Sequence, residues 1–320
     1  MVKQEEVKFY LEEQFDGNIS VLDRKTGYSN WNFTVEIDGD YFVYRCNRPD
    51  IEEENRLEIE YRVLEALECL NFGYSPEPVR YFSEKETELI EYIEGDVIDP
   101  QELPPERLAQ IFADIHSLDT EALQRKIPED ILRNTNTPEE DVEQFGVQRY
   151  EDIEGNKFSS DFMDWISEQL EAVKKEAGKI PSGRTGFVHG DISSSLIGSP
   201  QDPRLIDWER AGLNNNPEGE IVFMYIHEGL DRDFYKETLR DYADKMEVRK
   251  EEIFSVAEFK ERAILLNDII NWAKNWEVSA ESGNNEEFKE KVDSYVELYG
   301  DLFPEEGFDN NQIFLNDSRD

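Results

Sequence analysis

Two aspartates, Asp191 and Asp207, are the best candidates for catalytic residues because of their positions in the sequence. Asp191 lies in a loop three residues after Val188, where the apolar run Phe187-Val188 ends and a carboxylate can project into a cleft. Asp207 follows Leu205-Ile206 in the same manner. Phosphoryl transfer from ATP needs two such groups, one to orient and deprotonate a hydroxyl and one to hold Mg²⁺. Either aspartate alone would equally fit a turn or helix cap.

The segments around these aspartates resemble those of a known family. VHGDISSSL (188–196) and LIDWERAG (205–212) resemble the catalytic loop and the metal-binding segment of the aminoglycoside phosphotransferase and choline kinase superfamily. By this resemblance Asp191 is the catalytic aspartate, His189 buttresses its loop, and Asp207 is the metal ligand. The resemblance implies ATP and Mg²⁺ as cofactors and a small-molecule hydroxyl as the acceptor, with its identity left open among aminoglycoside, choline, sugar and related alcohols.

Matching parts occur earlier in the chain, in the order that the family has them. Gly27-Tyr28-Ser29-Asn30 resembles the phosphate-covering loop, although it is poor in glycine. Arg45 stands where the family has the base that contacts the ATP phosphates, and Glu60 resembles the helix glutamate that pairs with it. The backbone of Glu91 and Ile93 would bond adenine as the hinge does. Without the resemblance, Arg45 is simply a solvated side chain on a strand.

One position departs from the family pattern. The family has a metal-binding asparagine five residues after the catalytic aspartate, and this chain has Leu196, which offers no oxygen to a hard cation. A hydroxyl of Ser193, Ser194 or Ser195 could substitute. The alternative hypothesis is therefore a catalytically degenerate, nucleotide-binding or regulatory module. A third hypothesis is an acidic scaffold in which the motifs are coincidental.

The pattern of the chain predicts the α+β class and a two-lobed, protein-kinase-like fold, as the resemblance also implies. Alternation in 32–38 and 41–45 around Asp38-Gly39 predicts a hairpin, and the apolar spacing in 54–70 predicts a helix. We expect a small N-terminal lobe with an antiparallel sheet over 1–93. A larger, mainly helical C-terminal lobe is expected over 94–320, ending in a loosely held acidic tail at about 301–320.

Composition excludes several functions. Against 34 Lys and Arg stand 75 Asp and Glu, a formal charge of −41 without any basic stripe, which argues against nucleic-acid and membrane-surface binding. An adaptation to a salty cytosol, an acidic mesophilic protein and a trap for a cationic substrate all fit this charge. Cys46 and Cys69 are expected as reduced core residues of a cytoplasmic protein. The sequence leaves the oligomeric state open.

Overall fold

The structure is a computed structural model that describes residues 2–26, 30–48, 56–128, 132, 137–153, 157–180, 183–279 and 286–314. The chain divides into two compact units. The first comprises Met1–Asn134 and Gly186–Leu213, and the second comprises Thr135–Thr185 and Asn214–Asp320. The lobe boundary expected after residue 93 falls inside the first unit, and the division at that residue stays a prediction.

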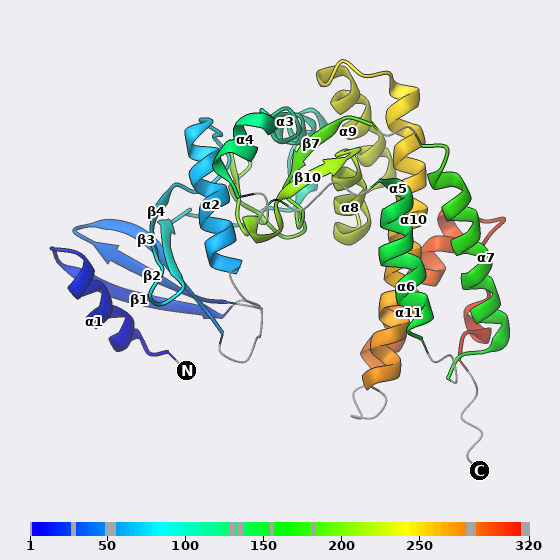
Figure 1. Cartoon of the computed structure of the whole chain (residues 1–320), viewed down its shortest axis with the longest axis horizontal. Helices are drawn as coiled ribbons and strands as arrows, with labels where there is room; N and C mark the ends of the chain where they lie inside the picture. The colour runs from blue at the N-terminus through cyan, green and yellow to red at the C-terminus, as the bar shows by residue number, and fades with distance from the viewer. Residues whose placement is uncertain are drawn as a thin grey trace, which may run out of the picture. The chain divides into compact units, whose positions relative to one another are not determined.

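A five-stranded antiparallel sheet forms the N-terminal part of the first unit, with the spatial order β1-β2-β3-β5-β4 (Figure 1). Its strands are β1 (Ile19–Thr26), β2 (Asn30–Ile37), β3 (Asp40–Asn47), β4 (Pro78–Phe82) and β5 (Thr87–Glu91). The predicted hairpin is confirmed, because β2 and β3 pair across a turn in which Asp38 and Gly39 both have positive φ. Such a two-residue turn matches the twist of the flanking strands.

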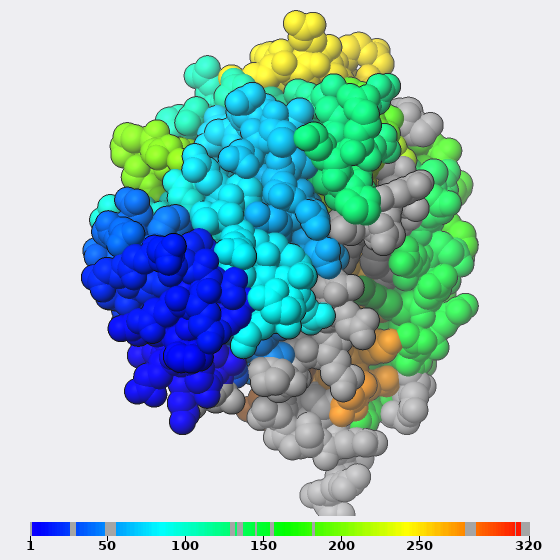
Figure 2. Space-filling model, turned by 60° about the vertical axis from the view of Figure 1, so that its left-hand side comes forward, coloured from blue at the N-terminus to red at the C-terminus, as the bar shows by residue number. Residues whose placement is uncertain are grey.

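One face of this sheet carries an apolar core. Helix α1 (Gln4–Gln14) packs on it and contributes Val7, Tyr10 and Leu11. The strands contribute alternate side chains, among them Phe33, Val35, Tyr44, Cys46, Phe82 and Leu89. In the space-filling view, α1 and the first strands make one continuous part of the surface, drawn in blue (Figure 2).

The opposite face of the sheet carries polar side chains that the site uses. Because side chains alternate along a strand, Arg45 points away from the core that contains Tyr44. Glu88 of β5 lies directly opposite Arg45 in the register and shares this face. Helix α2 (Arg56–Cys69) contacts β3, β4 and β5 and brings the buried Glu60 to it. The helix predicted over 54–70 is confirmed from Arg56 onward, and 51–55 lie outside the described residues.

The remainder of the first unit presents the two aspartate segments. Strand β7 (Thr185–Val188) pairs with β10 (Gly212–Asn215) and precedes the loop of Asp191. A second small sheet has the order β6-β8-β9. Its strands are β6 (Asp96–Val97), β8 (Leu196–Ser199) and β9 (Asp202–Leu205). Helices α3 (Pro105–His116) and α4 (Thr120–Lys126) complete the unit.

The second unit is mainly helical. Its long helix α10 (Lys250–Ser279) contacts α7 (Ser160–Ala177), α8 (Gly219–Glu228), α9 (Arg232–Lys245) and α11 (Glu286–Leu302), and also the short helix α6 (Gln148–Glu151). The short helix α5 (Pro138–Asp141) belongs to the same unit. A small antiparallel sheet followed by a mainly helical part confirms the α+β class. Within the ranges described, no helix is long and apolar enough to cross a membrane.

Two expectations about packing are wrong. Cys46 is buried, but Cys69 ends α2 on the exposed side, where its sulfur accepts a hydrogen bond from Lys126. The segment from residue 303 to 314 is not the loose tail that its acidic composition suggested. Phe303 and Ile313 are buried in the second unit, because apolar residues spaced along a polar segment still anchor it.

Candidate active site

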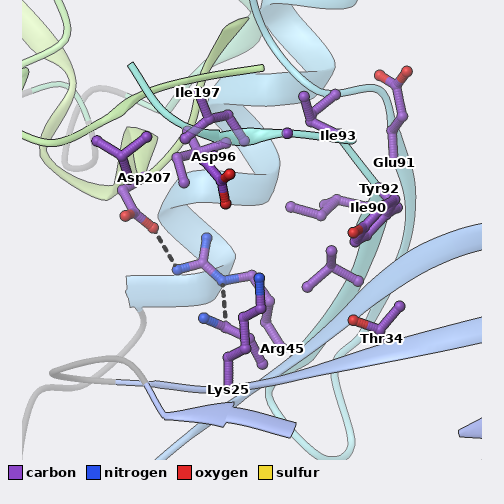
Figure 3. A pocket seen from close by; sticks show the side chains of 15 residues that line it. Lys25, Thr34, Arg45, Ile90, Glu91, Tyr92, Ile93, Asp96, Ile197 and Asp207 are labelled. Atoms are coloured by element: carbon purple, nitrogen blue, oxygen red, sulfur yellow. Dashed lines mark hydrogen bonds and ion pairs between the residues drawn. The ribbon is translucent and has the colours of Figure 1, made fainter. Parts of the chain in front are cut away.

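Arg45 is the centre of a buried charge cluster. Its Nη1 donates a short hydrogen bond to Glu60 Oε2, and its Nη2 lies 2.7 Å from Asp207 Oδ1. Its Nε donates to Asn32 Oδ1 at 3.2 Å, and Figure 3 shows the guanidinium directed at Asp207. One arginine on β3 thereby links a glutamate of α2 to the aspartate that follows β9. The pair of Arg45 with Glu60 that the resemblance implied is therefore formed.

Burial and charge act against each other in this cluster. Burial lowers the pKa of Arg45, but Glu60, Asp207 and Glu88 outweigh it and raise that pKa above its usual value. Burial raises the pKa of Glu60 to about 7, although Arg45 opposes the shift. Burial and the neighbouring Glu60 raise the pKa of Glu88 well above its usual value. The guanidinium is therefore permanently charged, whereas the two glutamates are poised to hold a proton.

His189 ties the two aspartate segments together. Its ring is fully buried, its Nε2 lies 2.8 Å from the carbonyl oxygen of Ile206, and its Nδ1 lies 3.3 Å from the backbone nitrogen of Asp191. These contacts fit a ring that donates through Nε2 and accepts at Nδ1. Trp208 packs against the ring at 4.4 Å between centroids. These contacts are consistent with the loop-buttress role that the resemblance implies for His189, and that role stays a prediction.

The backbone of both segments is specialised. Gly190 has φ +83°, and a Cβ there would lie 2.2 Å from the carbonyl oxygen of Arg210, so only glycine fits. Asp207 itself has φ 66°, in the left-handed region that a non-glycine residue enters at a cost of order 1–3 kcal/mol. Its carboxylate is aimed by this conformation at Arg45.

Leu196, which stands where the family has its asparagine, is buried in β8. Its side chain does not line either of the two cavities near the aspartates that the described residues form. Ser195 is also buried, and its Oγ donates to the carbonyl oxygen of Asp191 at 2.7 Å. A hydroxyl one position earlier therefore braces the loop, while the metal-binding oxygen of the family pattern has no counterpart at 196.

Two arginines and a glutamate of the site were missed by sequence reasoning. Arg210 Nε lies 3.4 Å from Asp191 Oδ2, and Arg56 Nη1 lies 2.6 Å from Glu209 Oε1. Arg210 and Glu209 lie within the recognised LIDWERAG segment, so the motif was a usable signal for them. Nothing in the local pattern pointed to Arg56, because its partner is far away in the sequence.

Two adjoining cavities bring these residues together. The first, of about 310 Å³, has a largely apolar wall that includes Val43, Ile90 and Ile197, together with Glu91 and Ile93 of the expected hinge (Figure 3). The second, of about 290 Å³, has an entirely polar lining: Asn30, Asn32, Arg45, Arg56, Asp191, Ser193, Ser195, Asp207, Glu209 and Arg210. Asn32, Arg45 and Asp207 line both. A flat apolar group beside a polyanion would match this pair of cavities.

All the predicted site residues that the structure describes lie on these elements. Asn30, Arg45, Asp191 and Asp207 line the polar cavity, and Glu91 and Ile93 line the apolar one. Glu60 and His189 line neither cavity. Glu60 contacts Arg45, and His189 contacts the backbone of Asp191. Residues 27–29 of the expected phosphate-covering loop lie outside the described residues. The roles assigned to these side chains stay predictions.

The side chains of the site determine whether and how Mg²⁺ could bind there. Among the residues that the structure describes, no group of three or more His, Cys, Asp or Glu side chains could hold a metal by itself. Mg²⁺ is usually bound through one or two carboxylates together with substrate phosphates and water. Asp207, which is half exposed beside the polar cavity, fits a Mg²⁺ that arrives with phosphates.

Solved structures show the same fold. A choline/ethanolamine kinase family protein from Mesorhizobium loti is 16% identical, with a TM-score of 0.64 over 90% of this chain and 88% of that one. The GDP complex of an aminoglycoside 2'-phosphotransferase is 13% identical, with a TM-score of 0.65 over 95% and 98%. A ternary complex of an aminoglycoside phosphotransferase with AMP-PNP and hygromycin B is 15% identical, with a TM-score of 0.62 over 91% and 98%. No curated protein matches the chain in sequence.

The fold is the one shared by these kinases and phosphotransferases. The model of the phosphotransferase enzyme family matches residues 21–251, which is most of the chain. The chain therefore belongs to this phosphotransferase family.

Proposed function

We propose that the protein transfers the γ-phosphoryl group of ATP to a hydroxyl of a small molecule, in the cytoplasm. The observation that carries this proposal is Arg45, which joins Glu60 and Asp207 at the wall of a polar cavity that also contains Asp191. The apolar cavity beside it suits adenine, with the backbone of Glu91 and Ile93 as bonding partners. Relatives of the same fold were solved with GDP and with AMP-PNP, which supports a nucleotide there.

The reaction needs few groups from the protein. Arg45, held by Glu60, binds phosphate oxygens, and Asp207 would hold Mg²⁺, which supplies positive charge to the phosphates. Asp191 orients the acceptor hydroxyl and takes its proton as the oxygen bonds to the γ-phosphorus and ADP leaves. The ion pair with Arg210 helps to orient the Asp191 carboxylate. Positioning and electrostatics supply the catalysis.

The test has two parts. Calorimetric titration of ATP, with and without Mg²⁺, should show binding that Mg²⁺ strengthens and that Asp207→Ala weakens. Asp202→Ala, which removes a carboxylate that is 79% exposed at the start of β9, is the matched control. An assay of ADP release with aminoglycosides, choline and sugars as acceptors should then identify the class of substrate. Folded protein that binds no ATP would refute the proposal.

A catalytically degenerate relative is the second candidate, and one observation favours it. Leu196 is buried and carries no oxygen where the family has a metal ligand. In that case ATP would bind as described above, but no acceptor would increase the release of ADP. Turnover, and not binding, separates the two functions.

A further inference from the structure

Glu88 is a buried acid that the proposed mechanism does not use. It lies on β5 directly opposite Arg45, its side chain is fully buried, and its Oε1 is 3.6 Å from Arg45 Nη1. Neither of its carboxyl oxygens accepts a hydrogen bond from any residue that the structure describes. A buried carboxylate without a donor is costly, so its surroundings must compensate for it in another way.

Glu60 can offset the cost of burying the Glu88 carboxylate without a hydrogen-bond donor. Both carboxyl groups lie against the same nitrogen, because Glu60 Oε2 accepts a hydrogen bond from Arg45 Nη1 and Glu88 Oε1 is 3.6 Å from that atom. Ionised carboxylates only accept hydrogen bonds, so a bond between these two exists only when one carries a proton. A shared proton would satisfy the otherwise unpartnered oxygen of Glu88.

The charge balance requires the same proton. Arg45 brings one positive charge, and Glu60, Glu88 and Asp207 approach it from three elements. Asp207 is half exposed, so water helps to solvate its charge, whereas the two glutamates are fully buried. Two adjacent buried carboxylates cannot both ionise cheaply, and such a pair titrates as a unit. The raised pKa values of both glutamates agree with this geometry.

We propose that Glu60 and Glu88 hold one proton between them, and that this proton sets the charge behind Arg45 and makes nucleotide affinity depend on pH. The proposal rests on the proposed function, because the ligand affected is ATP. With the proton, the pair carries one negative charge, which Arg45 balances while its Nη2 edge faces Asp207 and the cavity. Without the proton, the second buried negative charge repels phosphate and attracts the guanidinium of Arg45 away from the cavity.

Other charged or titratable groups act on the pair from every side. They are Arg45 on β3, Tyr61 on α2, Tyr81 on β4, and Asp207 and Glu209 after β9. Arg45 is the only cation among these five groups, and Asp207 and Glu209 both raise the pKa of Glu60. Asp207 and Glu209 therefore favour retention of the proton, whereas Arg45 opposes it.

The experiment compares ATP affinity in three full-length proteins, in the presence of Mg²⁺, from pH 6 to pH 9. For the wild type we expect Kd to rise with pH above the pKa of the pair, by up to about ten-fold per pH unit when one proton is linked. Glu88→Gln keeps the shape of the side chain, and its amide can donate to Glu60 as the proton did, so its slope should be flatter. Glu86→Gln, an exposed change on the same hairpin, should keep the wild-type slope.

The comparison with Glu88→Gln cancels the titration of ATP itself, so equal slopes in the wild type and this variant would overturn the proposal. If no variant binds ATP at any pH, it is the proposed function that fails. The shared proton is then tested in the free protein, and in the wild type alone if Glu88→Gln does not fold. Infrared spectroscopy at pH 7.5 should show the carbonyl band of a protonated carboxyl group, and its absence would refute the proton-sharing pair.

Discussion

Ser195 Oγ donates a hydrogen bond to the backbone carbonyl oxygen of Asp191 at 2.7 Å. The serine is buried, and it directly precedes Leu196, the position at which the resemblance implies an asparagine. Position 195 thus supplies a hydrogen bond that braces the loop of Asp191, while the side chain at position 196 offers no oxygen to a metal.

Removal of this brace should slow catalysis more than it weakens nucleotide binding. We expect Ser195→Ala to lower kcat by about 5-fold to 30-fold, which corresponds to about 1–2 kcal/mol for a buried hydrogen bond whose acceptor is left unpaired. The affinity for ATP should change little, because Arg45 and Asp207 remain in place. Ser199→Ala, which removes an exposed hydroxyl that accepts from Asp202, is the control in the same steady-state assay. A loss of ATP affinity without a loss of kcat would contradict the bracing role.

The carboxylate of Asp191 should be needed for turnover and dispensable for binding. Asp191→Asn keeps the volume of the side chain but cannot take a proton, so we expect kcat to fall by about 10²-fold to 10⁴-fold. Calorimetry should give an ATP affinity close to that of the wild type. Asp202→Asn, at the exposed start of β9, should leave both quantities unchanged. Unchanged turnover in Asp191→Asn would exclude this aspartate as the general base.

Restoration of the family's asparagine at 196 should not restore a metal ligand. Because Leu196 is buried and lines neither cavity, its replacement places an amide in an apolar environment. We expect Leu196→Asn to lower the free energy of unfolding by about 2–4 kcal/mol and to leave kcat no higher than in the wild type. Chemical denaturation measures the first quantity and the ADP-release assay the second. Leu196→Met, which conserves volume, should cost less than about 1.5 kcal/mol. A higher kcat for Leu196→Asn would show that this side chain does reach the metal.

Salt should stabilise the protein. A net charge of −41 opposes the compact state by self-repulsion, and the screening length falls from about 10 Å at 0.1 M salt to about 3 Å at 1 M. We expect Tm to rise between 0.1 M and 2 M KCl in a thermal melt. A matched series with sucrose, which adds no ionic screening, separates charge effects from solute exclusion. A Tm that stays constant or falls in KCl would argue against adaptation to a salty cytosol.

The sequence by itself determined the local elements and the two aspartate segments. The hairpin β2–β3, helix α2 and the segments of Asp191 and Asp207 depend on residues close together in the chain, where period and turn chemistry act. The pairing of Arg45 with Glu60 was also predicted, through the resemblance and not through any pattern of spacing.

Only the tertiary structure decided which distant side chains share one environment. Glu88 looked like one acid among 75, and its burial beside Arg45 follows from the register of β5 with β3 and the docking of α2. The contact of Arg56 with Glu209 likewise joins residues that are far apart in the sequence. Composition suggested a loose tail, yet Ile313 is buried. Burial and charge pairing depend on contacts across the fold, which the local pattern of a single chain does not encode.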